Sequence, residues 1–475
     1  MSHDCRSHYF ENGDNTIHNL ADGKATGPSK ISNEMLKHLS SQMLKHIKSL
    51  MNSCLEINDI PEFWKQANLY PIPKPKAWNY DLNNTRPITL LDTMRKVLVK
   101  ILNKRLSDIF VKHNILRGNQ FAGLPFQSTF EPIRIINELI EDAKENKKDI
   151  FILFQDLSKA YDRVNIFMLQ KAMRRLKIPE SFINLITNLF TNRKNRIFTA
   201  VGTTSPYDLL TGIDQGEIIS PLLWCIYYDP LLVELYKQGK GYKLSHRYRP
   251  NLYLDNYVEK ELHVPVTAFM DDTSYITHNK NDMEFQLKLA DSFYTLNNIL
   301  VNKTKSEILI KEKRKSTTNP HEITFSFGNQ TITLSYLKYN DSARFLGVWV
   351  NLSKSRNFII KQARDIVAEI TTSLRSKLIT DKQLLYIWNM VIIPRLEYRT
   401  QLCFLKETEC NRIISCFRRI FKWKLKFAST APNSLMNNTY LYNFRNLYDV
   451  QLQSKISNFI IQVNDKGLLE RIMNL

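Results

Sequence analysis

Two short apolar runs in this chain each end in aspartate, and this pattern limits how the chain can fold. Residues 264–270 form one run, which is followed directly by Asp271 and Asp272. Residues 151–154 form the other, which lies just before Asp156. Runs of this length are typical of buried strands, where a carboxylate is costly unless it is neutralised or paired with a cation. The two sites are far apart in the sequence, so only a folded sheet can unite them.

Strands that deliver carboxylates to one place would form a site for two divalent metal ions. Such sites activate an attacking oxygen and neutralise a leaving one in phosphoryl transfer. Mg²⁺ prefers a few carboxylates plus substrate phosphates, which two or three Asp side chains could supply. Taken alone, however, the Asp271-Asp272 pair is better explained as a turn, where Asp is common.

Chain length, net charge and the lack of a long apolar stretch narrow the classes to which this protein could belong. The chain has 475 residues, enough for two to four domains with a large core. Its net charge of +20 favours a polyanionic partner, either nucleic acid or an anionic membrane, although a basic but ordinary enzyme is the alternative. We expect no transmembrane helix, because no apolar stretch approaches eighteen uninterrupted residues.

The cysteines and the N-terminus bear on location. Six cysteines without a CxxC pair fit a reducing compartment, and the polar N-terminus lacks the apolar core of a signal peptide. We therefore expect an intracellular protein. The sequence leaves a nuclear location open, because no clear basic import cluster is present and residues 311–315 are only a suggestion of one.

The pattern along the chain predicts an α+β fold with an appended helical region. Residues 1–26 have the composition of a flexible leader, and residues 311–321 of a linker. Residues 265–277 are expected to form a hairpin with the acid pair at or near its turn. Helices are expected over residues 32–55, after Pro87, over 128–146, 167–176 and 181–190, within 211–235, and from about 357 onward.

Five short blocks occur in a fixed order, and together they resemble a reverse transcriptase, an RNA-directed DNA polymerase. The resemblance is greatest to the non-LTR (LINE-type) retrotransposon class and runs from about Gly27 to Asn351. Each block alone is weak evidence, and the ordered set carries the resemblance. The blocks are Arg86-Pro87-Ile88, Asp156-Leu157-Ser158-Lys159-Ala160-Tyr161-Asp162, Gln215-Gly216-Glu217-Ile218-Ile219-Ser220-Pro221, Phe269-Met270-Asp271-Asp272 and Phe345-Leu346-Gly347.

The resemblance implies a right-hand polymerase fold. Fingers would span about 27–150, the palm sheet about 151–351, and a helical thumb with a basic C-terminal region 352–475. The expected partners are an RNA template, a DNA primer and deoxynucleoside triphosphates, with no membrane. No endonuclease domain precedes the blocks, so an endonuclease, if any, is not expected in this chain.

The resemblance also implies roles for individual residues. Asp156, Asp271 and Asp272 would hold two Mg²⁺ or Mn²⁺ ions. Tyr161 would crowd a ribose 2′-hydroxyl, although an aromatic core residue after a strand is the alternative. The triphosphate would contact Arg86 and Lys74, the incoming base would lie on Gln215 and Gly216, and Lys305 would protonate the departing pyrophosphate.

A basic stretch near the C-terminus interleaves cations with aromatic side chains. Such a stretch suits a template–primer surface, because cations reach phosphates and aromatics stack on bases. A helix with its aromatics in the core and its cations in solvent explains the pattern equally well. The cations concerned are Arg412, Arg418, Arg419, Lys422, Lys424 and Lys426.

One departure from the LINE-type pattern affects the site, and two rival functions stay open. Met270 stands where LINE-type enzymes commonly have a small residue. The first rival is a reverse transcriptase of the group II intron maturase type. The second is a non-catalytic nucleic-acid-binding relic, whose binding would depend on salt but not on the acid pair.

Overall fold

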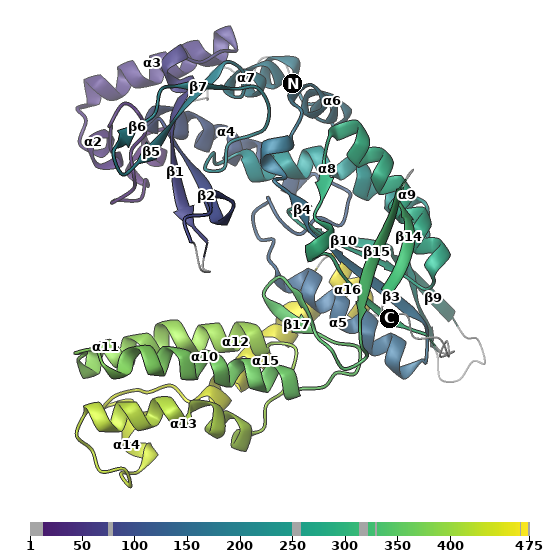
Figure 1. Cartoon of the computed structure of the whole chain (residues 1–475). Helices are drawn as coiled ribbons and strands as arrows, with labels where there is room; N and C mark the ends of the chain where they lie inside the picture. The colour runs from purple at the N-terminus through teal and green to yellow at the C-terminus, as the bar shows by residue number, and fades with distance from the viewer. Residues whose placement is uncertain are drawn as a thin grey trace.

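Three lobes make up the protein in this computed structural model (Figure 1). The structure describes residues 13–74, 79–248, 258–312, 322–327, 330–465 and 467–473. A lobe of helices and a small sheet stands at one end, a larger sheet covered by helices lies in the middle, and a purely helical lobe stands at the other end. This is the α+β right-hand arrangement of fingers, palm and thumb that the sequence predicts.

The fingers lobe combines four early helices with a five-stranded sheet. Strand β1 pairs antiparallel with β2 and parallel with β5, which also carries β6 and β7. Its helices are α1 (Gly13–His18), α2 (Asn33–Lys37), α3 (Ser41–Ile57) and α4 (Thr93–Lys112). Its strands are β1 (Gln66–Pro73), β2 (Thr85–Leu91), β5 (Arg193–Thr199), β6 (Gly202–Thr203) and β7 (Tyr207–Leu209).

Two features of this lobe differ from the sequence prediction. Residues 193–209 were expected in the palm but complete the fingers sheet, because β5 pairs with β1. The predicted flexible leader is wrong for residues 13–26, since α1 buries Ile17 and packs with α4. Residues 1–12 of that leader lie outside the described residues.

The palm is a six-stranded sheet in the order β10-β11-β3-β13-β15-β14. Strand β3 is buried on both faces: Phe151 and Leu153 face one hydrophobic cluster, whereas Ile152 and Phe154 face a second. Burial on both faces explains why its sequence is continuously apolar instead of alternating. The strands are β3 (Ile150–Gln155), β10 (Val266–Phe269), β11 (Asp272–Thr277), β13 (Glu307–Lys311), β14 (Glu322–Phe327) and β15 (Gln330–Leu337).

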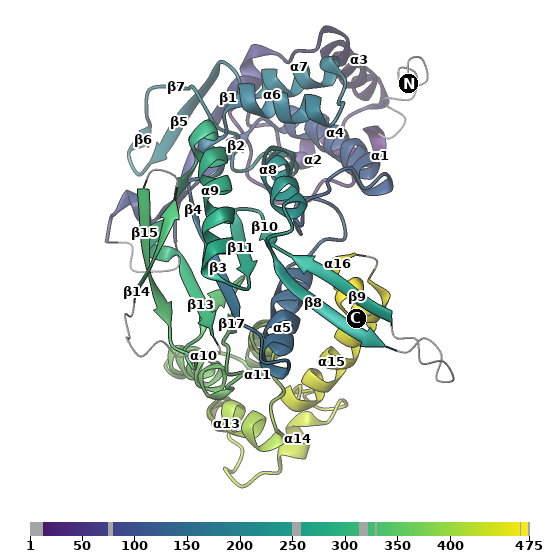
Figure 2. The same cartoon turned by 90° about the vertical axis from the view of Figure 1, so that its right-hand side faces the viewer.

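Helices cover the palm sheet on both faces (Figure 2). Helices α8 (Ser220–Lys237) and α9 (Lys280–Asn297) pack into the first cluster, and α5 (Phe130–Glu145) into the second, so α5 belongs with the palm although it was expected in the fingers. Helices α6 (Ile166–Arg175) and α7 (Glu180–Leu189) join the first cluster. Strands outside the six-stranded sheet complete the lobe: β4 (Leu157–Ser158), β8 (Tyr242–Tyr248), β9 (Val258–Val264), β12 (Leu300–Val301), β16 (Ala343–Phe345) and β17 (Val348–Val350). The predicted linker begins inside β13, and its residues 313–321 lie outside the described residues.

The thumb has its own aromatic core, in which Trp388 stacks on Phe417 and Phe444. Its elements are α10 (Asn357–Arg375), α11 (Asp381–Tyr386), the π-helical turn η5 (Ile387–Ile392), α12 (Ile393–Thr400), α13 (Glu407–Lys424), α14 (Asn433–Asn437) and α15 (Leu447–Asn464). The last helix, α16 (Leu468–Met473), leaves this lobe and packs beside α5 in the palm core (Figures 1 and 2). Within the described residues, no helix is both long enough and apolar enough to cross a membrane.

One backbone carbonyl joins the thumb to the palm. Gln401 O accepts from Arg134 Nη2 on α5 at 2.8 Å and from Lys455 Nζ on α15 at 2.6 Å. Two cations on one carbonyl repel each other, and burial together with nearby Arg134 lowers the pKa of Lys455 to about 8. The folded protein therefore holds the Lys455 proton less tightly than the unfolded chain does.

We predict that Lys455→Met raises the free energy of unfolding at pH 7 by about 1–2 kcal/mol, after a discount for solvent screening. The cost of charging Lys455 is fully present below pH 8 and disappears as the pH rises toward 10.5, the model value for lysine. Urea unfolding at pH 7 and pH 10 measures this, with Lys361→Met on exposed α10 as the control. An advantage of Lys455→Met that does not shrink with rising pH would contradict the prediction.

Candidate active site

The acid pair lies at the tight turn of the β10–β11 hairpin, as the sequence predicts: Asp271 is in the turn and Asp272 begins β11. Phe269 pairs with Asp272, which leaves Met270 and Asp271 as the two turn residues. The neighbouring strand β3 pairs Gln155 with Thr273. Asp156 therefore leaves β3 at the edge where the hairpin turns, and the sheet unites the three carboxylates from the two distant segments.

Burial and the repulsion between neighbouring carboxylates raise the pKa values at this edge of the sheet. Burial raises the pKa of Asp271, and the Asp156 charge raises it further. Burial and the charges of Asp271 and Asp156 raise the pKa of Asp272 to about 7. Asp156 Oδ2 accepts a hydrogen bond at 3.0 Å from Lys305 Nζ, a largely exposed ammonium. The cluster therefore has more negative charge than its surroundings neutralise.

This donor set fits Mg²⁺ or Mn²⁺ in its chemistry. Among the described residues, no three His, Cys, Asp or Glu side chains are arranged so that they form a complete metal site by themselves. Mg²⁺ does not require one, because it is commonly held by one or two carboxylates together with substrate phosphates and water. A divalent cation would also offset the repulsion that raises the pKa of Asp271 and Asp272.

Three buried tyrosines form a hydrogen-bond network that connects β3 and β11, the two strands next to the carboxylates. Tyr294 OH donates to Gln155 Oε1 at 2.7 Å, next to Asp156. Its single proton is thereby used, so it accepts from Tyr228 OH at 2.7 Å and from Tyr275 OH at 2.8 Å. Tyr228 OH in turn lies 3.0 Å from Thr273 Oγ1, next to Asp272. Sequence reasoning missed this network, because each tyrosine reads as an ordinary core residue.

Tyr161 reaches the acid turn from the segment that follows β3. It lies in the 3₁₀ turn η3 (Tyr161–Arg163), where its ring is 6.0 Å from that of Trp224. Its hydroxyl donates to Met270 Sδ at 3.6 Å, and burial raises its pKa. The side chain is half-buried and not enclosed in the core. It therefore lies against the turn, where a nucleotide gate is expected.

The Gln215-Gly216 loop docks on strand β2. Thr89 N donates to Gln215 O at 2.9 Å. Gly216 has φ +135°, and a Cβ there would lie 2.5 Å from Thr89 O, so only glycine fits this approach. Arg86 is exposed farther along β2, where it pairs with Ile72 of β1. Lys74 follows β1, and its N–H donates to Asn84 O at 2.8 Å. The predicted triphosphate and base contacts thus share one hairpin and its docked loop.

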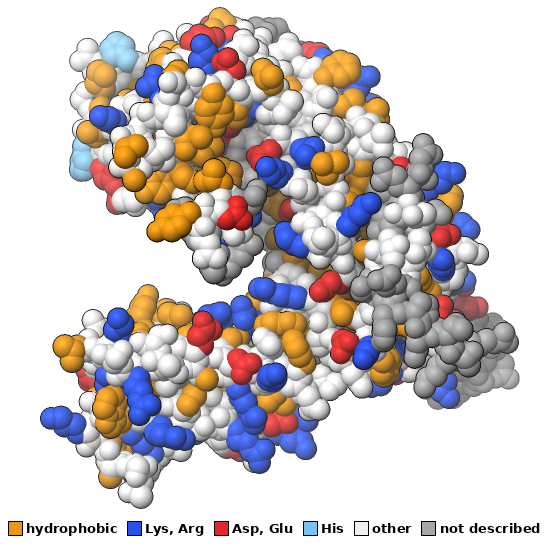
Figure 3. All heavy atoms as spheres, in the orientation of Figure 1, with side chains coloured by type: hydrophobic (Ala, Val, Ile, Leu, Met, Phe, Trp, Pro, Cys, Tyr) orange, Lys and Arg blue, Asp and Glu red, His pale blue; other side chains and the backbone are white. Residues whose placement is uncertain are grey.

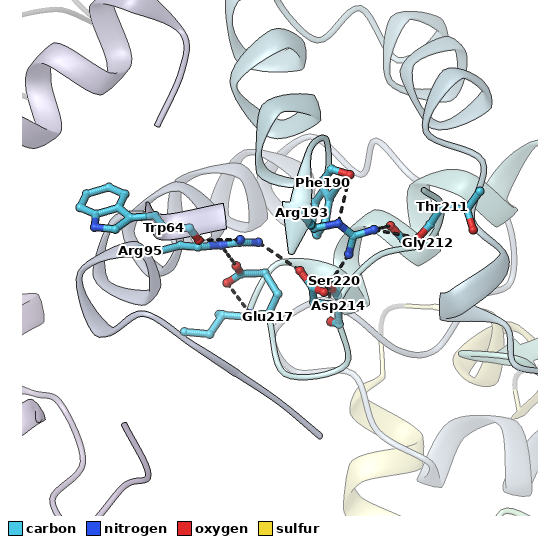
Figure 4. Close-up of polar contacts among 10 residues, drawn as sticks. Trp64, Arg95, Phe190, Arg193, Thr211, Gly212, Asp214, Glu217 and Ser220 are labelled. Atoms are coloured by element: carbon cyan, nitrogen blue, oxygen red, sulfur yellow. Dashed lines mark hydrogen bonds and ion pairs between the residues drawn. The ribbon is translucent and has the colours of Figure 1, made fainter. Parts of the chain in front are cut away.

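A buried cluster of four charges fixes this loop (Figure 4). Arg95 Nε donates to Glu217 Oε2 at 2.7 Å and Arg95 Nη2 to Asp214 Oδ2 at 3.2 Å, whereas Arg193 Nη1 donates to Asp214 Oδ1 at 2.7 Å. Arg193 Nη2 also donates to the carbonyls of Thr211 and Gly212, each at 2.7 Å. All four charged side chains are almost fully buried. The cluster holds the loop on both sides of Gln215.

The cations predicted to contact nucleic acid, on and just after helix α13, fall into two groups: some bond within the thumb and others are exposed. Arg418 is buried and donates to Asn411 Oδ1 at 2.9 Å. Lys422 Nζ donates to Ala431 O at 2.6 Å, and Lys424 Nζ donates to Lys377 O at 2.7 Å. These three cations hold thumb backbone or side-chain groups in this structure, and their expected role as phosphate contacts stays a prediction. The exposed cations are Arg412, Arg419 and Lys426.

The last block forms a turn at the junction of palm and thumb. The β16–β17 hairpin turns at Leu346 and Gly347, both with positive φ. Tyr398 OH on α12 donates to Leu346 O at 2.6 Å. On the other side, Phe345 stacks on Phe154 of β3 with ring centroids 5.0 Å apart. This turn therefore couples the thumb to the strand that leads to Asp156.

Comparisons with known proteins agree with this geometry. The model of the family described as "Reverse transcriptase (RNA-dependent DNA polymerase)" matches residues 72–350. A "Probable RNA-directed DNA polymerase from transposon BS" of Drosophila melanogaster is 26% identical over 204 residues, which cover 43% of this chain and 22% of that protein. A "Retrovirus-related Pol polyprotein from type-1 retrotransposable element R2" of Nasonia vitripennis is 24% identical over 389 residues, which cover 81% of this chain and 35% of that protein.

A solved structure of telomerase from Candida albicans, in complex with a fragment of telomeric RNA, is a distant structural neighbour. It superposes with a TM-score of 0.43 at 14% identity and covers 93% of this chain and 65% of that chain. This likeness is too loose to support a functional conclusion. The chain spans about a fifth to a third of the length of the curated relatives named above.

We predict that Glu217→Gln lowers the free energy of unfolding by about 3–5 kcal/mol, because it leaves two buried cations, Arg95 and Arg193, to share the single carboxylate of Asp214. Urea unfolding measures the loss. Glu180→Gln is the matched control, since Glu180 also receives two hydrogen bonds from one arginine, Arg174, but in solvent. Equal and small losses in both variants would show that the buried cluster contributes little to the fold.

Proposed function

Because this chain belongs to the reverse transcriptase (RNA-dependent DNA polymerase) family, we propose that it extends a DNA primer along an RNA template. The observation that carries the proposal is the convergence of Asp156, Asp271 and Asp272 at one edge of the palm sheet. Relatives from transposons and R2 elements support a non-LTR retrotransposon enzyme over an intron maturase.

The three carboxylates would hold the metal ions. Bound there, Mg²⁺ or Mn²⁺ would lower the pKa of the primer 3′-hydroxyl and neutralise charge on the transferred phosphoryl group. Arg86 and Lys74 would bind the triphosphate, and Tyr161 would leave no room for a ribose 2′-hydroxyl. The Gln215-Gly216 loop would support the incoming base.

Lys305 would act on the leaving group. In this structure its Nζ pairs with Asp156 Oδ2, a position that a metal ion would compete for. Displaced from Asp156, the ammonium would be free to donate a proton to the departing pyrophosphate. Such general acid catalysis is worth about 10²–10⁴-fold in rate.

The template and primer would lie in the cleft between the fingers and the thumb. Figure 3 shows this cleft open to solvent, with Lys and Arg side chains along its inner wall. The net charge of +20 favours a polyanion in such a cleft. Arg412, Arg419 and Lys426, the exposed cations of the basic stretch, would contribute phosphate contacts only to nucleic acid that extends beyond this cleft, because α13 lies on the side of the thumb away from the fingers (Figures 1 and 2).

We predict that Asp271→Asn and Asp156→Asn each reduce Mg²⁺-dependent primer extension on poly(A)/oligo(dT) by about 10²–10³-fold or more, because they weaken metal electrostatics at the reacting phosphate. Asp365→Asn, on an exposed face of α10, is the control and should retain full activity. Extension by the double variant would refute the assignment. A wild-type protein that only binds nucleic acid, indifferent to loss of the acids, would instead be the inactive relic.

We predict that Tyr161→Val reduces the preference for deoxynucleotides over ribonucleotides by about 10–100-fold, because it removes the bulk expected beside the 2′ position. Tyr161→Phe keeps that bulk and loses only the hydroxyl contact with Met270. It should therefore keep most of the preference. The ratio of kcat/KM for the two nucleotide types measures the effect. If Tyr161→Val left that ratio unchanged, Tyr161 would be a core residue and not a gate.

A further inference from the structure

A buried glutamine holds the backbone of the catalytic turn. Gln120 Nε2 donates to Met270 O at 3.1 Å, and Met270 N donates to Gln120 Oε1 at 2.9 Å. One carboxamide thus satisfies both backbone groups of the residue that directly precedes Asp271. Gln120 is 4% exposed, so its amide has little access to water as an alternative partner.

The turn needs such support because Met270 is held in a conformation that suits glycine. Its φ is +56°, in the left-handed region that L side chains seldom adopt. Positive φ is usual at the centre of tight hairpin turns, but Gly, Asn or Asp normally occupies such positions. A bulky residue persists there only when its surroundings hold it, and the Gln120 amide supplies two of the holding bonds.

Gln120 is itself held rigidly by the palm. Its segment runs beside the edge strand β10, where Phe121 N donates to Ala268 O and Ala268 N donates to Asn119 O, each at 2.8 Å. This short stretch therefore continues the palm sheet past its last strand.

Helix α8 anchors the start of the same segment. Gly118 N donates to Asp229 Oδ1 at 2.9 Å, and a Cβ on Gly118 would lie 2.5 Å from Leu232 Cβ. Asp229 is in turn paired with Arg175 of α6. The segment that contains Gln120 thus connects the packed palm helices to the turn.

We propose that Gln120 is a positioning residue for the catalytic carboxylates. It does not contact substrate; it fixes Met270, and Met270 fixes two functional groups at once. The Met270 backbone leads into Asp271, and its sulfur accepts the Tyr161 hydroxyl. A shift of the turn would therefore move both the carboxylates and the gate. The inference rests on the proposed polymerase function.

Gln120→Met is the variant that tests this proposal, because it keeps the side-chain volume and removes both hydrogen bonds. Displacing reacting groups by about 1 Å can cost 10²-fold in rate. We expect kcat for primer extension to fall by about that factor, whereas KM for the nucleotide and Kd for template–primer stay within threefold. The Mg²⁺ concentration needed for half-maximal rate should rise.

Gln120→Glu tests the two hydrogen bonds between Gln120 and Met270 separately. Its carboxylate still accepts from Met270 N–H but cannot donate to Met270 O, so kcat should again fall. Gln286→Met is the matched control, since Gln286 is equally buried and its Nε2 donates to a backbone carbonyl, Lys240 O, at 2.6 Å. This control should lose stability to a similar degree while keeping kcat.

Two readouts do not depend on activity. In Gln120→Met, hydrogen–deuterium exchange of the peptide 266–275 should accelerate, and Mn²⁺ should bind the carboxylates more weakly; Gln286→Met should change neither. A kcat within threefold of wild type, an unchanged exchange rate, or an equal loss of kcat in Gln286→Met would overturn the proposal. If the wild type itself failed to extend a primer, the proposed function would be wrong, and exchange and Mn²⁺ binding would still decide whether Gln120 holds the turn.

Discussion

The pairing of β3 with β11 is the interaction on which the rest of the structure depends. Strand β3 is buried between two hydrophobic clusters, so its position is set by packing on both faces. A shift of one residue would exchange its two faces. Both faces are apolar, so the shift is opposed by the loss of specific side-chain packing in the two clusters. The register Gln155–Thr273 then leaves no freedom in where Asp156 meets the acid turn. The position of the three carboxylates relative to one another is thus a consequence of strand register.

Hydrophobic packing sets the positions of the strands, and buried polar interactions then fix the loops and turns beside them. The tyrosine chain through Tyr294 holds the two strands, the Arg95–Glu217 cluster holds the Gln215 loop, and Gln120 holds the turn. Buried polar groups contribute little net stability, but once they are fully paired they permit few alternative arrangements. All three occur where substrate groups are expected to meet, which is where an ångström of freedom would matter most.

The sequence predicted the parts of the site that depend on local pattern. Apolar runs ending in acids located the sheet edge and the hairpin, and ordered blocks located the Gln215 loop. Contacts between distant segments could not be predicted where no local pattern marks both partners: Arg95 and Glu217 are separated by 122 positions, and no apolar run ends at either of them as one does near Asp156 and at Asp271. Composition also did not reveal that Lys422 and Lys424 donate to backbone carbonyls of the thumb, since a cation in a sequence does not show which acceptor it will meet.

The acid edge is destabilising on its own, and the surrounding fold has to offset it. Buried like charges raise the pKa of Asp271 and Asp272, and Met270 adds backbone strain beside them. Such features persist only where neighbouring structure holds them, and they are typical of functional sites. Lys305 relieves part of the charge through Asp156, but its ammonium is largely exposed and therefore a weak partner. A more strongly binding cation would displace it at little cost, so the Lys305–Asp156 ion pair is compatible with the proposed function, in which the carboxylates hold metal ions and the lysine donates a proton.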